Sequence, residues 1–251
     1  MRRVSSGAFH RLPAACGERS SSSVSCASHL AFYGSFGKPL DKGEAIADNA
    51  CQNFVSRRFK RRVRGYQKDV LIVITVVQSP NPILNQPCEP CDLGDKSLKR
   101  LAKQMVKTMY KNSGCGLAAP QVGVTKRLVV IDCDESDEQN PLVLVNPVLV
   151  ETKGEVVVEG EGCLSIPGIS VPIARPSWAR VRFFDLDGEE WEIEGDGLLG
   201  RCLQHELDHL DGVTMFERCD PLARIQALRD YDQAVASGAK PGETSLDPRV
   251  R

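Results

Sequence analysis

Two histidines and a glutamate lie close together in the segment His205-Glu206-Leu207-Asp208-His209. Two imidazoles four positions apart lie one turn apart on the same face of a helix, so both can reach one metal ion. The carboxylate of Glu206, beside the first imidazole, is close enough to handle a proton of water held by that ion. Only two of the chain's four histidines follow residue 29, and both are in this segment. The pattern indicates a metal-dependent hydrolase.

A third protein ligand must come from elsewhere, because catalytic zinc-type sites normally use three protein groups and leave one position for water. No histidine follows His209, and Glu217 is the nearest downstream glutamate. A better candidate stretch lies upstream, in Glu161-Gly162-Cys163-Leu164-Ser165. We therefore expect the third ligand to come from this upstream stretch.

Three segments together are similar to the ordered motifs of a known family. They are Gly114-Cys115-Gly116-Leu117-Ala118-Ala119-Pro120-Gln121, then Glu161-Gly162-Cys163-Leu164-Ser165, then His205-Glu206-Leu207-Asp208-His209. In this order they resemble the peptide deformylase family, over about residues 70 to 230. The resemblance implies an enzyme that removes the formyl group from the N-terminal methionine of newly made proteins and releases formate.

The resemblance also implies a role for individual residues. Glu206 would be the general base and acid. The side-chain amide of Gln121 and the backbone N–H of Leu164 would stabilise the charge that develops on the formyl oxygen. Gly116, which lacks a side chain, would let the backbone approach the substrate peptide. Three residues would bind the metal, with water in the fourth position: Cys163, His205 and His209.

The expected metal and substrate follow from the same resemblance. It implies Fe²⁺ in the cell, with Zn²⁺ as a weaker replacement, and a Cys/His₂ set also suits Co²⁺ and Ni²⁺. The N-formylmethionyl nascent peptide would lie extended beside a strand edge. Its methionine side chain could rest near Leu198 and Cys202, which precede His205 by seven and three residues. This function implies a position near the ribosome, although the core shows no basic patch and the net charge of −1 gives no reason to expect nucleic-acid binding.

Two other functions would explain part of the pattern. A zinc endopeptidase would explain the histidine motif but would leave the glycine-rich motif and Cys163 without a role. A metal that only stabilises the fold would be expected to have four protein ligands and no acid beside them. Glu206 argues against that second alternative.

Several residues near these motifs have less specific interpretations. We interpret Cys115 as a small apolar pocket wall rather than a reactive thiol, and Cys202 likewise as wall. Arg175 is expected to form an ion pair with Glu161. For Arg201 we weigh two alternatives equally: a pair with an acid such as Glu161, or a side chain that extends to solvent.

Two further pairs are expected to have structural roles. Cys88 and Cys91 form one C-x-x-C, which we interpret as a loop with two free thiols rather than half a zinc ribbon or a redox pair. Trp178 and Trp191 are expected in the core or on a strand surface rather than against substrate.

The spacing of apolar residues predicts the helices and strands around the three motifs. Helices are predicted over residues 98–109, with Asp95 or Ser97 as N-cap, over 196–210, with Asp196 as N-cap, and over 221–236. Strands are predicted over residues 70–77, 127–133, 142–150, 155–159, 179–186 and 190–194. Asp187-Gly188 is a hairpin turn signal between the last two. The family resemblance implies an α+β fold, with mixed and antiparallel sheets packed around the metal-binding helix and a C-terminal helix.

The charge distribution suggests a boundary near residue 66. Residues 1–65 hold 12 Lys/Arg and 4 Asp/Glu, whereas the rest of the chain has a net charge of −9. The first segment is rich in Ser and has no apolar period, so it cannot bury enough surface to order itself. We expect a disordered leader over residues 1–66, a catalytic domain over 67–236 and a flexible tail over 237–251.

The leader and the cysteines bear on the compartment. The leader resembles an organellar transit peptide; the favoured alternative is a stretch upstream of a wrongly chosen start codon. The apolar runs are too short to span a membrane, and ten irregularly spaced cysteines without a secretory signal indicate a reducing compartment. We expect a cytoplasmic enzyme of bacterial type, or a mitochondrial or plastid enzyme if the leader is a transit peptide.

Overall fold

The fold centres on one curved antiparallel sheet. The computed structural model describes residues 8–11, 73–134 and 138–245. Its six strands lie in the order β1-β6-β5-β4-β3-β2, and every neighbouring pair is antiparallel. The strands are β1 Ala8–Arg11, β2 Gly116–Ala118, β3 Leu128–Ile131, β4 Leu142–Cys163, β5 Ile166–Phe184 and β6 Glu190–Asp196. The expectation of an α+β fold is confirmed, and the sheet is antiparallel throughout.

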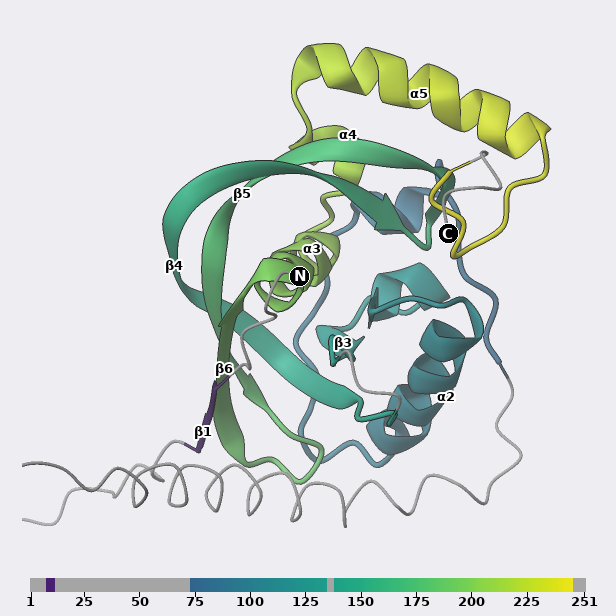
Figure 1. The fold of residues 1–251 in the computed structure, drawn as a ribbon. Helices are drawn as coiled ribbons and strands as arrows, with labels where there is room; N and C mark the ends of the chain where they lie inside the picture. The colour runs from purple at the N-terminus through teal and green to yellow at the C-terminus, as the bar shows by residue number, and fades with distance from the viewer. Residues whose placement is uncertain (1–7, 12–72, 135–137, 246–251) are drawn as a thin grey trace, which may run out of the picture. The chain divides into compact units, whose positions relative to one another are not determined.

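β4 and β5 are far longer than the predicted strands. The predicted strands 142–150 and 155–159 are two parts of β4, and 179–186 is the end of β5. The register between β4 and β5 shifts at four places, including Lys153/Val156 and Glu161/Cys163. Such irregularities bend a strand without ending it. The two strands consequently curve around one helix, as Figure 1 shows.

That central helix is α3, Gly197–Leu210, the predicted metal-binding helix. Ten of its fourteen residues are buried, which is the expected result for a helix enclosed by a sheet. It begins after Asp196, whose side chain makes no capping hydrogen bond, and ends before Gly212 at a φ of 75°. Its apolar residues join Val181 and Ile193 of the sheet in one core cluster.

Two longer helices complete the fold. α2, Ser97–Lys111, buries Ala102, Met105 and Met109 against a second core cluster. The predicted N-cap, Asp95 or Ser97, is wrong by one residue: Lys96 is at the N-cap and makes no side-chain capping bond, although the Asp95 carboxylate accepts the N–H of Ser97, the first helical residue. α5, Pro221–Ala236, has the predicted bounds, and Asp220 caps it by accepting the N–H of Leu222. The shorter helices are η2 Pro82–Asn85, η3 Ala119–Val122 and α4 Met215–Arg218.

The predicted strand over residues 70–77 is wrong for its described part, residues 73–77, which have no regular secondary structure. Val76 is buried in the core, as the apolar run suggested. The backbone, however, bonds to groups outside the sheet: Ile74 N–H to the hydroxyl of Thr108, and Val77 N–H to the carbonyl of Gln121. Residues 70–72 lie outside the described part of the chain.

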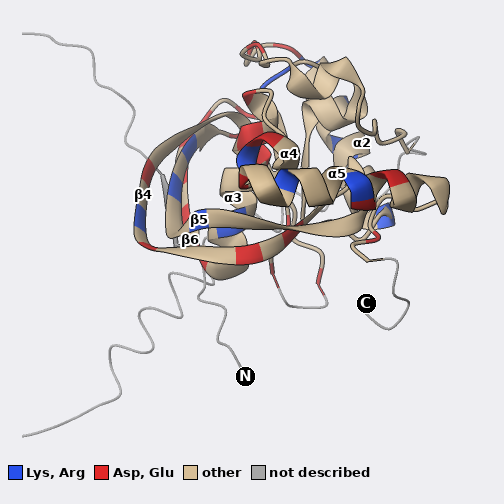
Figure 2. Cartoon of the chain, turned by 90° about the horizontal axis from the view of Figure 1, so that it is seen from above, with Lys and Arg blue, Asp and Glu red and all other residues tan. Residues whose placement is uncertain are grey.

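The hairpin predicted at Asp187-Gly188 is confirmed between β5 and β6, and its charged strands pair across the sheet. Gly188 has a φ of 80°, which favours glycine at the turn. On the outer face, Arg180 Nε lies 2.7 Å from Glu194 Oε2 and Arg182 Nε lies 3.2 Å from Glu192 Oε1. Figure 2 shows basic and acidic residues interspersed over these strands.

The ends of the chain differ from the expectation in detail. Within the predicted leader, Ala8–Arg11 pairs with β6 as strand β1, and the rest of residues 1–66 lies outside the described residues. Within the predicted loose tail, residues 237–245 are described, and the backbone carbonyl of Glu243 accepts the N–H of Gly168 at 2.7 Å. This hydrogen bond holds the tail against the first residues of β5.

Candidate metal centre and active site

The structure brings together the three predicted metal ligands. His205 and His209 lie one turn apart on α3, and Cys163 is the last residue of β4. The sulfur of Cys163 lies 3.2 Å from Nε2 of His209. One donor atom from each of the three residues lies within 4.8 Å of the other two. A thiolate and two imidazoles at this spacing can bind one divalent metal ion.

A buried acidic group orients the first imidazole. Nδ1 of His205 lies 2.9 Å from Oε2 of Glu161, so the other ring nitrogen is available to a metal. Arg175 donates to both carboxylate oxygens of Glu161, at 2.6 and 3.0 Å. Arg201 donates to the same carboxylate at 2.7 Å. The predicted Arg175–Glu161 pair is confirmed, and of the two alternatives for Arg201 the structure shows the pair with Glu161.

The charges of this group suit a cation in the centre. Burial would raise the pKa of Glu161, but hydrogen bonds from His205 and Arg175 hold it well below its usual range. Burial would also lower the pKa of His205, but Cys163 and Glu161 raise it well above its usual value. Burial lowers the pKa of His209, which favours the neutral ring that binds metals. The residues present therefore fit a divalent metal.

Glu206 is a buried carboxylate with a free oxygen. It is 4% exposed, and Oε2 has no hydrogen-bond partner among the described residues. Desolvation raises the pKa of Glu206 to about 8. A carboxyl group of this kind can both accept and return a proton near neutral pH, which general acid–base catalysis requires. Such a group is costly to bury without a partner, and a reacting substrate would supply one.

Gly116 makes the room that Glu206 occupies. A Cβ atom on Gly116 would lie 2.3 Å from Oε1 of Glu206 and 2.8 Å from the sulfur of Cys202. Real Cβ atoms essentially never come this close to other heavy atoms, so one of these side chains would have to move. Sequence reasoning assigned this glycine to contact with substrate. The structure adds a second requirement, which is space for the carboxylate.

Gln121 is held so that its amino group faces the centre. Its carbonyl oxygen accepts the N–H of Ala118 at 2.8 Å, and Nε2 lies 3.5 Å from the sulfur of Cys163. The side chain is buried, and Gln121 belongs to the short helix η3 that follows β2. Leu164 directly follows Cys163 and is also buried. Both residues predicted to face the formyl oxygen thus border the same centre.

A cavity of about 230 Å³ opens beside the centre. Most predicted site residues line it, and so do Leu198 and Cys202, where the methionine side chain was expected. Three residues of the tail also line it, and sequence reasoning missed them: Gly242, Glu243 and Thr244. Two glycines make room where the tail packs against the cavity, and they were the only local signal of this contact in the sequence. A Cβ atom on Gly162 would lie 2.4 Å from Thr244, and one on Gly242 would lie 2.1 Å from Asn112.

The residues expected to be structural lie outside this cavity. Cys88 and Cys91 are buried free thiols, and burial raises the pKa of each to about 11. Trp178 lies under the ammonium group of Lys153, 3.7 Å from the ring centroid. Trp191 donates its ring N–H to Asp185. None of these four residues lines the cavity.

Comparison with known proteins establishes the family. The model of the family described as polypeptide deformylase matches residues 73–224, more than half of the chain. The chain belongs to the polypeptide deformylase family. The matched range contains all three motifs and every predicted site residue.

Curated relatives and solved structures agree with this membership. The peptide deformylase of Rhizobium meliloti is 43% identical over 163 residues, which cover 64% of this chain and 94% of the relative. That of Thermodesulfovibrio yellowstonii is 41% identical over 155 residues, 61% of this chain and 93% of the relative. A peptide deformylase from Legionella pneumophila superposes with a TM-score of 0.63 at 38% identity, covering 66% of this chain and 98% of that one.

A solved relative with a ligand has the same fold. The peptide deformylase from Synechococcus elongatus, crystallised in complex with actinonin, superposes with a TM-score of 0.62 at 36% identity, covering 70% of this chain and 96% of that one. This deformylase is accordingly a metal-dependent hydrolase that removes the formyl group from formylated nascent peptides. Among the residues that the structure describes, no helix is long and apolar enough to cross a membrane.

The space at Gly116 gives a testable prediction for this deformylase. The substitution Gly116→Ala should displace the Glu206 carboxylate, because the new methyl group would overlap Oε1. A displacement of about 1 Å in a catalytic group can cost about 10²-fold in rate, so we expect kcat to fall by about that factor. Formate release measures kcat. Metal content should stay unchanged, because the three atoms nearest to the new methyl group belong to Glu206 and Cys202 and not to a predicted ligand.

The matched control is Gly188→Ala in the β5–β6 turn. A Cβ atom there would meet nothing within 4 Å, although the positive φ costs some stability. Its kcat should stay close to that of the parent. A Gly116→Ala enzyme with the parent kcat would show that Glu206 does not depend on this space.

Proposed function

We propose that this deformylase binds its metal through Cys163, His205 and His209 and moves protons through Glu206. The observation that carries the proposal is the convergence of the three donor atoms within 4.8 Å, next to a buried carboxylate oxygen without a partner. A divalent metal, when bound there, supplies a Lewis acid that lowers the pKa of water. The protein's own residues account for the remaining steps.

Glu206 carries one proton from the attacking water to the departing amine. Glu206 accepts a proton from the attacking water, and its desolvated position makes the protonated form stable enough to hold that proton. Once water has added to the formyl carbon, the C–N bond breaks and Glu206 delivers the proton to the departing amine. The products are formate and a free amino terminus.

Two donors are proposed to stabilise the reacting oxygen. The amino group of Gln121 faces the centre because its carbonyl oxygen is held by Ala118 N–H. The backbone N–H of Leu164 follows the Cys163 ligand in sequence. Donors that are fixed before the reaction stabilise a developing oxyanion without reorganisation. The substrate methionine is proposed to fill the cavity beside Leu198 and Cys202.

The metal in the cell is proposed to be Fe²⁺, with Zn²⁺, Ni²⁺ or Co²⁺ able to substitute. The donor set of one thiolate and two imidazoles suits all four ions. We expect formate release from a formyl-methionyl peptide to decay in air for the iron-loaded enzyme and to persist for the nickel-loaded enzyme. A ferrous ion held by these residues would make the site sensitive to oxygen, and the Cys163 sulfur could be oxidised with it.

This experiment compares enzyme samples that differ only in the metal. Each is assayed for formate over time in air and under argon, and the oxidation state of Cys163 is read by mass spectrometry. Equal lifetimes in air for iron and nickel would contradict an iron-centred enzyme. An internal peptide bond in the same assay should stay intact, which separates deformylation from endopeptidase activity.

The enzyme is proposed to work in the cytoplasm close to the ribosome, where formylated chains emerge. The alternative is a mitochondrion or plastid, if residues 1–66 act as a transit peptide. Fusing these residues to a fluorescent reporter in a eukaryotic cell separates the two: organellar signal supports the transit peptide, and diffuse signal supports the cytoplasmic site. Co-sedimentation of the full chain with ribosomes tests the proximity.

Removing residues 1–66 should leave deformylase activity intact, because the core clusters and the cavity draw on residues 74–244. The deletion takes away strand β1, which is four residues long and at the edge of the sheet. We expect a loss of at most about 1 kcal/mol in the free energy of unfolding, or about 2–4 °C in Tm. Formate release and thermal unfolding of both forms measure this, and an inactive or insoluble short form would contradict the boundary.

A further inference from the structure

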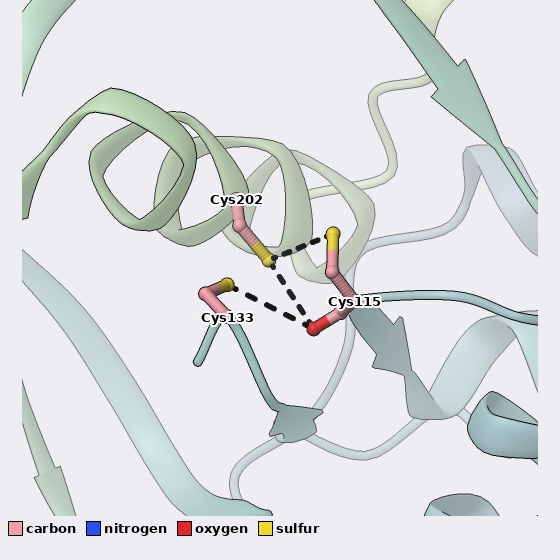
Figure 3. A group of neighbouring side chains, drawn as sticks. All are labelled: Cys115, Cys133 and Cys202. Carbon is pink, nitrogen blue, oxygen red and sulfur yellow. Dashed lines mark hydrogen bonds between the residues drawn. The ribbon is translucent and has the colours of Figure 1, made fainter. Parts of the chain in front are cut away.

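Three cysteines that are neither proposed ligands of the catalytic metal nor proton donors lie together beside the centre. Cys115 directly precedes β2, Cys133 follows β3, and Cys202 is in the middle of α3. β2 and β3 are paired with Gly116 opposite Ile131, and Asp132 N–H donates to the carbonyl of Cys115, so the first two cysteines leave the sheet at the same end. Figure 3 shows the three side chains of this thiol cluster converging between α3 and the sheet.

The sulfur positions are close to those around a metal ion. The sulfurs of Cys115 and Cys202 are 4.0 Å apart, and all three sulfurs lie within 4.8 Å of one another. Three thiolates bound tetrahedrally to one zinc ion at about 2.3 Å each would be about 3.8 Å apart. Movements of less than about 1 Å would therefore complete such a site. A disulfide would instead require two sulfurs at about 2.05 Å and would leave the third cysteine unused.

The cluster also has the charge and the access that a metal site needs. Hydrogen bonds from Cys133 and Cys202 lower the pKa of the Cys115 thiol to about 3, while the same contacts raise the pKa of the other two thiols. The cluster thus places three soft sulfur donors within 4.8 Å of one another, one of them with a lowered pKa. Cys115 and Cys202 line the catalytic cavity, which gives an ion a path in and water a place in the fourth position.

We propose that Cys115, Cys133 and Cys202 form a second metal site, separate from the catalytic centre, for a soft thiolate-binding cation such as Zn²⁺ or Cu⁺. Thiolates select these ions over Mg²⁺ or Ca²⁺, which prefer oxygen ligands. On binding, each thiol that is still protonated releases its proton to solvent. Because two ligands belong to the cavity wall, an ion here would narrow the space that receives the substrate side chain.

Titration of the full chain with Cd²⁺ tests the proposal, since cadmium bound to thiolates absorbs in the ultraviolet. The comparison is between Cys133→Ser and Cys88→Ser. Both positions are cysteines that the mechanism leaves unused, but Cys88 lies outside the thiol cluster. We expect Cys133→Ser to bind one equivalent less than the parent, and Cys88→Ser to bind the same number as the parent.

Two further variants keep the test decisive. Cys163→Ala removes a ligand of the catalytic centre and should retain the equivalent that Cys133→Ser loses. Cys133→Ala serves if the serine variant does not fold, as judged by circular dichroism, and should show the same loss. The proposal is overturned if Cys133 and Cys88 variants bind equal amounts of cadmium, or if the missing equivalent disappears with Cys163 instead.

Discussion

Replacing Glu206 by glutamine should leave a folded, metal-loaded protein whose turnover is lower by a factor of about 10²–10⁴ or more. The amide is nearly isosteric with the carboxylate, so it fits the space beside Gly116. It cannot accept the proton of the attacking water or deliver it to the amine. Since the proposed metal ligands are untouched, metal content should remain that of the parent and the KM should change little.

The matched comparison is Cys163→Ala, which removes a proposed ligand and leaves the carboxylate. This variant should lose its metal, and its activity should fall for that reason. Elemental analysis and formate release are measured on both proteins side by side. A glutamine variant with near-normal turnover, or one that has lost its metal, would refute the assigned proton transfer.

Replacing Arg175 by methionine should lower the free energy of unfolding by about 3–5 kcal/mol, because a buried charge would lose its partner. Arg175 is 4% exposed and bridges Glu161 and Asp208 on two elements, β4 and α3. Methionine preserves most of the side chain's apolar length but none of its donors. Arg201 still binds Glu161, so we expect the lower part of this range.

Arg182→Met is the control on the same strand. Its guanidinium pairs with Glu192 on the surface, where the Arg182 side chain is 46% exposed, and exposed pairs contribute about 0–1 kcal/mol. Urea unfolding of both variants, with and without metal, separates the loss of the pair from any loss of the ion. Equal stabilities for the two variants would show that Glu161 does not need Arg175.

Local signals predicted the helices well. α5 has its predicted bounds because Asp220 and Pro221 supply a cap and a first-turn residue, and these act within a few positions of each other. α3 was predicted from the spacing of His205 and His209 as well as from the spacing of its apolar residues. The proposed metal ligands could be assigned for the same reason, since two of them lie four positions apart in one helix.

Features that depend on distant contacts could not be predicted in this way. Residues 73–77 are as apolar as a strand, but Thr108 and Gln121 take up their backbone groups, so no ladder forms. The bends that join the parts of β4 depend on its register with β5. The choice between the two alternatives for Arg201 depended on where Glu161 lies after folding. The predicted wall cysteines Cys115 and Cys202 meet Cys133 only because α3 crosses the ends of β2 and β3.

The residues that line the cavity are spread along the sequence, and this determines when the active site can form during synthesis of the chain. The wall extends from Ser113 to Thr244, so its two ends are made far apart in time. Even when β4 has left the ribosome, the helix that carries His205 and the residues that close the cavity are still to come. The active site therefore cannot form until α3 and the residues of the tail that line the cavity have been synthesised.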